Sequence, residues 1–305
     1  MRIVYLGTPD FAVAPLKSLI DNRYNVVGVV TNKDKPVGRK QILTAPPVKV
    51  LAIENNIPVY QYDKIRCEGV EDLKNLQPDI MVTCAFGQIL SQEILDIPKL
   101  GTINIHASLL PLYRGASPIH YAILNGEKKT GITIMKTDVG IDTGDIIYQR
   151  EIDIKDNETC GELFNRLSVL GAQCIIEALP SIANGTAKFI KQDNNLATTT
   201  KIIRKDMAKI DWCDSADDVC NKIRAFNPAP IAFTFYNNEP FKIYEAKPVK
   251  LTGSSGVILK ADNELVIGCG KGAISLLKVQ KAGGKPMDIK DFLRGNKLVV
   301  GEVFA

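Results

Sequence analysis

The sequence predicts an α/β fold, with an open, mostly parallel sheet covered by helices on both faces and a smaller β-barrel domain after it. Up to about residue 189, short apolar runs rich in β-branched residues alternate with helix-like patterns. The stretch KQDNNLATTTKIIRKD that follows is polar and lacks apolar periodicity, which suits a linker. Beyond it, Gly, Asn and Pro turns separate short β-like runs. We therefore expect a first domain over 1–189, a linker over 190–207 and a barrel over 208–305.

In the first domain, strands are expected at continuous apolar runs, as in parallel sheets buried on both faces. These runs are RIVYLG (2–7), NVVGVVTN (25–32), DIMVTCAF (79–86), LGTINIHA (100–107), TGITIMKT (130–137) and DIIYQREIDI (145–154). Helix patterns separate them, with Asp10 and Ser117 as candidate N-caps. The expected helices are FAVAPLKSLI (11–20), PPVKVLAIENN (46–56), SPIHYAILNG (117–126) and ETCGELFNRLSVLGAQCIIEALPSI (158–182).

The last part of the chain predicts one helix, over 216–226, and then mainly strands. The expected strands are IAFTFYN (231–237), EPFKIYEAKPV (239–249), GVILKA (256–261), ELVIGCG (264–270) and AISLLKVQ (273–280). Their regular spacing between turn residues is typical of a small all-β barrel.

Composition favours a soluble protein of a reducing compartment. No apolar run approaches the roughly 18 residues of a membrane span, and MRIVYLGTPDFAVAPL has Gly, Pro and Asp too early for a secretory signal. The seven cysteines are scattered without a CxxC pair, and two histidines are too few for a His/Cys zinc site. We expect a cytoplasmic protein with no bound metal and no membrane segment.

Charge is divided unevenly along the chain. Residues 1–200 carry 21 basic and 22 acidic residues, whereas residues 201–305 carry 17 basic and 12 acidic ones. A basic C-terminal third suggests a polyanionic partner, but on charge alone a solvated basic surface is the better interpretation of so modest an excess.

The stretch INIHASLLP (103–111) places an amide and an imidazole on one face of an apolar strand. Asn104 and His106 alternate with isoleucines, so both side chains should point the same way. The strand ends here, and ligands of open α/β sheets bind beyond the carboxyl ends of the strands. YLGTPDFA holds one glycine rather than GxGxxG, so this Rossmann-like sheet lacks the dinucleotide fingerprint.

The loop DVGIDTGDI (138–146) offers carboxylates that could complete a catalytic group. An imidazole moves protons, an amide N–H stabilises a developing oxyanion, and a carboxylate orients the imidazole. Such a set suits acyl transfer to an amine, which needs no nucleophilic Ser or Cys. A buried strand histidine with satisfied partners, next to an ordinary Asp/Gly turn, would give the same pattern.

The motifs together resemble the folate-dependent formyltransferase superfamily, whose signature is NxHxSLLPxxRG with a downstream DxGDI. This sequence has Asn104-Ile-His106, Ser108-Leu-Leu-Pro111, Arg114-Gly115 and Asp142-Thr-Gly-Asp145-Ile. Further stretches are similar to the branch of that superfamily that formylates methionyl-tRNA, and the similarity runs from end to end. They are IVYLGTPDFAVAPL, TNKDKPVGRKQILTAPPVK, ATTTKIIRKDMAKIDW, IRAFNPAP and LLKVQKAGGKPMDIKDFLRG.

The resemblance implies formyl transfer from 10-formyltetrahydrofolate to the α-amino group of methionine on initiator tRNA, in translation initiation. It implies that Asn104 holds the formyl oxygen, that His106 moves protons and stabilises the oxyanion, and that Asp142 pairs with His106. Asp138 and Asp145 stay open as alternatives to Asp142. The resemblance also implies an oligonucleotide-binding (OB-like) barrel that contacts tRNA, and we expect a monomer.

Binding residues follow from the same resemblance. Those implied to contact the folate co-substrate are Ser108, Leu109, Leu110, Pro111, Phe86, Gly87, Gln88 and Ile89. Those implied to contact tRNA are the basic loop residues Lys33, Lys35, Arg39 and Lys40, and Phe11 would border the methionine. A solvated loop and a helix-core position are the plainer interpretations of the cations and of Phe11. Gln41-Ile42 and Ala229 depart from many relatives, which carry more basic residues and a tryptophan there.

Other functions remain open at this point. The same catalytic domain could formylate an amino-sugar nucleotide or another small amine, or hydrolyse formyltetrahydrofolate. A different class of protein, a non-catalytic binder of tRNA or folate, could retain the fold. The basic β-domain argues against a purine-precursor enzyme, and the joint presence of Asn104, His106 and Asp142 argues against a non-catalytic copy.

Overall fold

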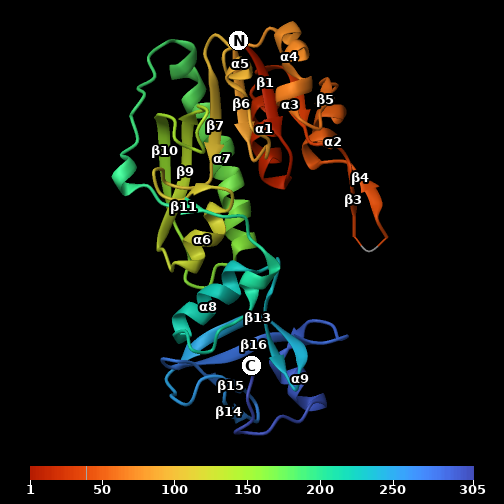
Figure 1. The fold of residues 1–305 in the computed structure, drawn as a ribbon, viewed down its shortest axis with the longest axis vertical. Helices are drawn as coiled ribbons and strands as arrows, with labels where there is room; N and C mark the ends of the chain where they lie inside the picture. The colour runs from red at the N-terminus through yellow and green to blue at the C-terminus, as the bar shows by residue number, and fades with distance from the viewer. Residues whose placement is uncertain (39) are drawn as a thin grey trace. The chain divides into compact units, whose positions relative to one another are not determined.

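The computed structural model describes residues 1–38 and 40–305, which form two compact units (Figure 1). Unit 1 comprises Met1–Pro118, Thr130–Ile152 and Phe164–Thr200, and unit 2 comprises Ile119–Lys129, Asp153–Leu163 and Lys201–Ala305. Unit 2 therefore contains two short segments from the first part of the chain besides its C-terminal part.

Unit 1 is built on a seven-stranded sheet with the order β10-β9-β7-β6-β1-β2-β5. Its strands are β1 (Arg2–Gly7), β2 (Asn25–Thr31), β5 (Val59–Gln61), β6 (Ile80–Cys84), β7 (Thr102–His106), β9 (Lys129–Lys136) and β10 (Ile146–Asp153). The pairs β1–β2, β1–β6, β2–β5 and β6–β7 are parallel, and β9 is antiparallel to β7. The predicted mostly parallel sheet is confirmed.

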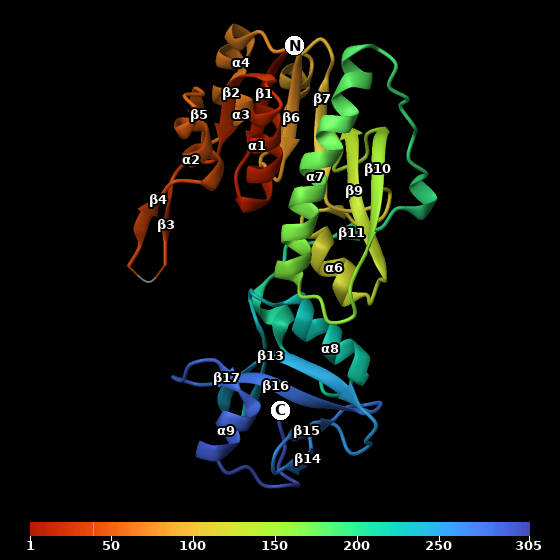
Figure 2. The same ribbon diagram turned by 180° about the vertical axis from the view of Figure 1, so that it is seen from behind.

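Alternate strand residues point to opposite faces of this sheet, and helices cover both faces. Val4, Leu6 and Met81 pack in one buried cluster with the short helices α3, α4 and α5. On the other face, Gly171 of α7 lies close to Ile105 of β7, and Figure 2 shows α1 and α7 on this side. The helices up to residue 183 are α1 (Val13–Asp21), α2 (Pro47–Glu54), α3 (Ile65–Glu68), α4 (Val70–Leu76), α5 (Gln92–Leu95), α6 (Pro118–Leu124) and α7 (Cys160–Ala183).

Two local predictions were wrong. The basic stretch expected as a loop contains a hairpin, β3 (Lys35–Val37) and β4 (Ile42–Thr44), which projects from the sheet in Figure 1. Asp10 does not cap α1, because it begins the short 3-10 helix η1 (Asp10–Ala12), and Ala12 is the N-cap of α1 without a side-chain hydrogen bond.

Among the described residues, helix α7 is the one segment long and apolar enough to cross a membrane by length and composition. Its most apolar window is 56% buried inside the protein. Within unit 1, Ser168 of this helix donates to the carbonyl of Phe11, and the carbonyl of Ala172 accepts from Ser18. These contacts are those of a core helix.

The polar residues after α7 return to the sheet edge of unit 1. Residues 194–196 form the 3-10 helix η2 (Asn194–Leu196), and β11 (Thr199–Thr200) pairs in parallel with β8 (Arg114–Gly115). We call residues 192–200 the strap. A Cβ atom on Gly115, whose φ is +109°, would lie 2.6 Å from the carbonyl oxygen of Thr200, so only glycine permits this close approach.

Unit 2 contains an antiparallel sheet with the order β12-β13-β16-β15-β14, and β17 pairs with β16. Its strands are β12 (Ala232–Tyr236), β13 (Glu239–Val249), β14 (Ile258–Ala261), β15 (Leu265–Gly268), β16 (Ala273–Lys281) and β17 (Met287–Asp288). Its other elements are η3 (Lys205–Ala208), α8 (Ala216–Ala225) and α9 (Ile289–Gly295). The predicted β-rich second domain, with the helix over 216–226 before its strands, is confirmed.

Residues 302–305 join the two ends of this sheet. The backbones of Ala305 and Phe235 in β12 exchange two hydrogen bonds of 2.9 Å. Val303 forms an antiparallel bridge with Val257, next to β14. The buried ring of Phe304 lies between these two contacts and stacks on Tyr236 with a centroid distance of 4.9 Å. Closing the sheet in this way leaves fewer unpaired edge groups.

Candidate active site

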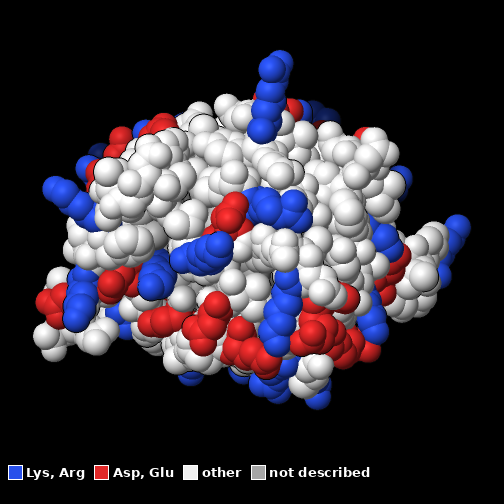
Figure 3. All heavy atoms as spheres, turned by 90° about the horizontal axis from the view of Figure 1, so that it is seen from above, with Lys and Arg blue, Asp and Glu red and all other residues white. Residues whose placement is uncertain are grey.

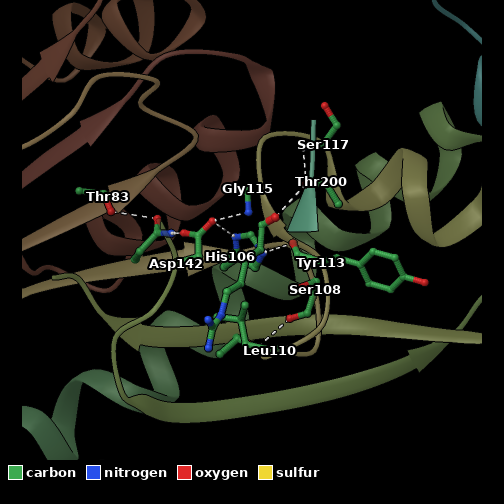
Figure 4. A network of polar contacts seen from close by, with 12 residues as sticks. Thr83, His106, Ser108, Leu110, Tyr113, Gly115, Ser117, Asp142 and Thr200 are labelled. Atoms are coloured by element: carbon green, nitrogen blue, oxygen red, sulfur yellow. Dashed lines mark hydrogen bonds and ion pairs between the residues drawn. The ribbon is translucent and has the colours of Figure 1, made fainter. Parts of the chain in front are cut away.

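Strand β7 delivers Asn104 and His106 to its carboxyl end, next to β6. The intervening Ile103 and Ile105 are buried in the core, which sends the two polar side chains to the other face. His106 is itself only 6% exposed. Figure 4 shows the imidazole of His106 facing Asp142 at this strand end.

Asp142 contacts both of these side chains from the loop between β9 and β10. Its Oδ1 accepts a hydrogen bond from Asn104 Nδ2 at 3.3 Å, and its Oδ2 lies 3.5 Å from His106 Nδ1. The backbone N–H of Gly115 donates to the same Oδ2 at 2.8 Å. Asp142 adopts a left-handed conformation with φ of 53°, a sparsely populated region for a residue with a side chain.

The other two aspartates of this loop do not contact His106 in the described structure. Asp138 Oδ1 accepts from the backbone of Gly140 at 3.0 Å and from Thr143 Oγ1 at 2.7 Å, so it holds its own turn. The backbone carbonyl of Asp145 accepts from the N–H of Lys136. Geometry therefore places Asp142, among the three, beside the imidazole.

The hydrogen bonds of His106 fix its tautomer. Its Nε2 lies 3.0 Å from the carbonyl oxygen of Tyr113, and a carbonyl can only accept, so Nε2 carries a hydrogen. Nδ1 is then the nitrogen left to face Asp142. Nδ1, which faces the carboxylate at 3.5 Å, is thus the position at which the His106–Asp142 pair can take up a proton.

The amide of Asn104 is oriented by Thr83, which lies on β6. Thr83 Oγ1 donates to Asn104 Oδ1 at 2.9 Å and also lies 3.2 Å from the carbonyl oxygen of Ile103. The other end of the amide, the N–H₂ group, donates to Asp142, and its second N–H has no partner among the described residues. The arrangement offers a hydrogen-bond donor and a proton carrier a few ångströms apart.

The turn after β7 is held by side-chain hydrogen bonds, and most of its side chains are at least partly buried. Ser108 Oγ donates to the carbonyl of Leu112 at 2.6 Å, and Thr133 Oγ1 donates to the carbonyl of Ser108 at 2.6 Å. Leu110 packs with Met135 and Ile146, and its carbonyl accepts from Gln149 at 2.8 Å. Leu109 and Pro111 are half-buried.

The loop over 86–89 follows β6 at the same edge of the sheet. Phe86 is buried, and its carbonyl accepts from Thr8 and Asn32. The Gln88 amide bonds to the backbone of Ile65 and Tyr62 and to the side chain of Asn32, so it holds the loop. Gly87 has a φ of +80°, and Ile89 is 71% exposed.

The basic residues expected on the first loop differ in their surroundings. Lys33 forms an ion pair with Asp63, and this hydrogen bond raises the pKa of Lys33. Lys35 and Lys40 are exposed on the β3–β4 hairpin, which also exposes Val37, Ile42 and Leu43. Arg39 lies outside the described residues.

Two further residues singled out by the sequence lie in packed surroundings. Phe11 is 4% exposed and meets Phe164 edge-on at a centroid distance of 5.1 Å, so it is a core residue. His120, on α6, is hydrogen-bonded to the backbone of Ala229, and burial lowers its pKa.

Sequence reasoning missed the residues that hold this site in place. They are Thr83, the backbone of Tyr113 and Gly115, and the strap residues Gln192, Thr198 and Thr200. The dipeptide Arg114-Gly115 within the motif was the one available signal for the close approach of strand β11. The others are ordinary polar residues whose partners lie far away in the sequence.

Charges of both signs lie on the surface at one end of unit 1 (Figure 3). The end of unit 1 that carries the N-terminus shows basic and acidic side chains interleaved (Figure 3). Lys74 pairs with Glu71 and Glu93 there, both at 3.0 Å. Across residues 1–38 and 40–305, no group of three or more His, Cys, Asp or Glu side chains is placed to hold a metal ion.

The chain is similar to known formyltransferases along its whole length. Residues 1–179 match the formyl transferase family, and residues 202–297 match the family of formyl transferase C-terminal domains. The methionyl-tRNA formyltransferase of Ruminiclostridium cellulolyticum is 44% identical over 99% of both chains. That of Bacillus subtilis is 44% identical over 99% of this chain and 97% of its own.

A solved structure of an N-formyltransferase from Helicobacter canadensis, in complex with folinic acid and dTDP-3-aminofucose, has a similar fold. Its TM-score is 0.70 at 25% identity, and the match covers 92% of this chain and 98% of that one.

Proposed function

Because the chain belongs to the methionyl-tRNA formyltransferase family, we propose that it transfers the formyl group of 10-formyltetrahydrofolate to the α-amino group of methionine on initiator tRNA. The observation that carries the proposal is the meeting of Asn104, His106 and Asp142 at one strand end. No other described cluster combines an oriented amide donor with a proton-carrying pair.

Formyl transfer needs help at three points: the charge on the formyl oxygen must be stabilised, the amine must lose a proton, and the departing nitrogen must gain one. The methionine amine attacks the formyl carbon, and the C=O electrons move to the oxygen, where the Asn104 N–H that has no partner among the described residues stabilises the charge. The amine then loses a proton, which the His106–Asp142 pair accepts and passes to the departing folate nitrogen. The bond to that nitrogen breaks as the oxyanion collapses, so the formyl group ends on methionine.

Apolar surface near these residues supports a flat folate as donor. Val139 and Ile141 lie in the loop that carries Asp142 and are 68% and 74% exposed, and Ile89, in the loop after β6, is 71% exposed. Exposed aliphatic side chains of this kind commonly cover an apolar ligand. Ser108, Leu109, Leu110, Pro111 and residues 86–89 are the proposed walls of that pocket.

Charge supports tRNA as the acceptor. Lys35 and Lys40 are exposed on the projecting hairpin, and Lys242 and Lys247 are exposed on β13. Phosphates of a polyanion would pair with such lysines, with an affinity that falls as salt rises. The proposal includes a cytoplasmic monomer, with 1–189 as the catalytic domain, 190–207 as the linker and 208–305 as the tRNA-binding domain.

The test compares the two histidines of the chain. The protein is mixed with 10-formyltetrahydrofolate and methionine-charged initiator tRNA, and formyl-methionine is quantified for the parent, His106→Ala and His120→Gln. We expect His106→Ala to lower the rate by a factor of about 10² or more, since it removes the proton carrier. His120→Gln should stay within a few-fold of the parent.

Two results would contradict the proposal. Equal losses in both variants would mean that His106 has no special role. If the tRNA stayed unformylated while the folate lost its formyl group, the catalytic chemistry would stand and the acceptor would be wrong. An amino-sugar nucleotide or water would then be the acceptor to assay.

A further inference from the structure

We propose that Gln192 is a positioning residue for the catalytic aspartate, and that the strap which carries it holds the His106–Asp142 pair in its working geometry. The inference rests on the proposed function, since it assigns residues to that reaction. Gln192 would not touch the substrate. It would keep the Asp142 loop and the turn after β7 together.

Gln192 uses its whole side-chain amide to join two segments of the site. Its Nε2 donates to the carbonyls of Asp142 at 2.9 Å and Gly144 at 2.7 Å. Its Oε1 accepts from Arg114 Nε at 3.0 Å. One amide therefore connects the aspartate loop to the turn that follows β7.

The hydrogen bonds from Gln192 matter because Asp142 has a left-handed backbone that its surroundings must hold in place. A residue with φ of 53° is held there only when its surroundings over-determine it. The two hydrogen bonds from Gln192 hold the carbonyl of Asp142 itself and that of Gly144, two residues further along the same loop. Without them, the loop can relax, and the carboxylate moves away from His106.

The rest of the strap fixes the turn that contacts both members of the pair. Thr198 Oγ1 accepts from the N–H of Tyr113 at 2.8 Å, and Thr200 Oγ1 donates to the carbonyl of Arg114 at 3.1 Å. The same turn supplies the Tyr113 carbonyl that holds His106 Nε2, and the Gly115 N–H that holds Asp142 Oδ2. Figure 4 shows Thr200, Tyr113 and Gly115 around the pair.

The strap therefore holds the turn after β7 and the loop that carries Asp142. These two segments in turn hold the imidazole of His106 and the carboxylate of Asp142. The role needs the donors of Gln192, because both of its loop partners are carbonyl oxygens. A side chain of the same size without N–H groups cannot replace it.

The test uses Gln192→Ala, Gln192→Glu and a control, Leu196→Ala. Glu keeps the size of Gln and can still accept from Arg114, but it presents oxygens to the two carbonyls. Leu196 lies on the strap with its side chain 61% exposed, so its truncation changes the segment without removing these bonds. Each variant is assayed for kcat, KM and the pH dependence of kcat, and its thermal unfolding is recorded.

We expect both Gln192 variants to lower kcat by about tenfold or more, with KM for tRNA near the parent value and an altered pH profile. Leu196→Ala should match the parent. A role in packing alone predicts that Gln192→Glu keeps activity. Retained activity in Gln192→Glu, or in Gln192→Ala, overturns the inference, as does a loss of kcat with an unchanged pH profile.

A second measurement separates this inference from the proposed function. Deuterium uptake of residues 113–117 and 140–146 is followed by mass spectrometry in the parent and in Gln192→Ala. We expect faster uptake in the variant, confined to these segments. If the parent failed to formylate tRNA while this difference appeared, the acceptor would be wrong and the strap would still support the pair. Unchanged uptake would refute the strap's role whatever the parent's activity.

Discussion

At the residue scale, the orientation of the Asn104 amide depends on a hydroxyl group of the neighbouring strand. Thr83 Oγ1 donates to Asn104 Oδ1, and the N–H₂ end of the amide donates to Asp142 in the proposed active site. An amide without this partner can rotate and present its oxygen, which would repel a developing oxyanion. Thr83, which would not itself contact the substrate, therefore favours the orientation in which Asn104 presents an N–H donor.

Replacing Thr83 with Val should lower kcat by about five- to tenfold, because the hydrogen bond that orients the Asn104 amide, worth about 1 kcal/mol, is lost at nearly the same side-chain shape. The longer contact of the hydroxyl with the Ile103 carbonyl is lost as well. The matched control is Thr102→Val on β7, since Thr102 Oγ1 is buried and has no hydrogen-bond partner among the described residues. The measurement is steady-state formyl transfer. Equal rates in the two variants would show that Thr83 does not orient the amide.

A pH effect is expected from His120. Burial lowers the pKa of His120 in the folded protein, so the unfolded chain binds its proton more readily. The stability from neutral His120 is present above the ordinary histidine pKa of about 6.5 and is lost as pH falls through it. In His120→Gln, the decrease in Tm between pH 7.5 and pH 5.5 should be smaller than in the parent. An unchanged decrease would assign the acid sensitivity to other groups.

At the element scale, the short strands β8 and β11 matter more than their length suggests. Their pairing depends on Gly115, where an added Cβ would meet the Thr200 carbonyl oxygen. The same glycine donates its N–H to Asp142. Movement of this strand pair would therefore also move the carboxylate of Asp142, the proposed catalytic aspartate.

Gly115→Ala should reduce formyl transfer by at least tenfold and also lower the free energy of unfolding. Gly185→Ala is the matched control, because Gly185 also has a positive φ, of 68°, but a Cβ atom added there would have no described atom within 4 Å. The control carries the left-handed backbone cost of about 1 kcal/mol without the collision. The measurements are urea unfolding and the formylation assay. A Gly115 variant that lost stability but kept its rate would show that the β8–β11 pairing does not affect the Asp142 carboxylate.

Long, strongly patterned elements were predictable from the sequence. The continuous apolar runs of β1, β6 and β7, and the periodic face of α7, determine their conformation locally. The proximity of Asn104, His106 and the aspartate loop also followed from strand alternation and from the rule for sheet ends. The helices α3 and α5 and the strands β8 and β11 were not expected, since elements this short show no full period.

The support of the site could not be predicted in the same way. Gln192, Thr198 and Thr200 stand in a polar stretch without periodicity, and their partners at 113–115 and 142–144 are distant in the chain. Only the folded backbone brings them together. The choice of Asp142 among three aspartates also depended on local turns, because Asp138 is used by its own loop.

At the scale of the whole molecule, the barrel of unit 2 depends on residues 302–305 for its closure. Phe304 is 2% exposed and packs against Tyr236, Phe241 and Trp212. It thus links the closing segment to the core of the barrel.

Phe304→Ala should lower the free energy of unfolding of the barrel by about 3–5 kcal/mol, the usual cost of removing a buried phenyl ring. Val303→Ala is the control, because Val303 is 55% exposed and forms its bridge through the backbone. Thermal unfolding and tRNA binding by the full chain are the measurements. A cost below about 1 kcal/mol would mean that the closing segment contributes little to the barrel.

The position of the strap has a practical consequence for protein engineering. A chimaera that exchanges the C-terminal domain for another binding module needs a junction, and the polar stretch after α7 invites one at residue 190. A transplant made there would keep Asn104, His106 and Asp142 but discard Gln192, Thr198 and Thr200. The donor fragment should therefore extend through Thr200, so that only residues beyond it are exchanged. Insertions meant to lengthen the tether belong after the same residue.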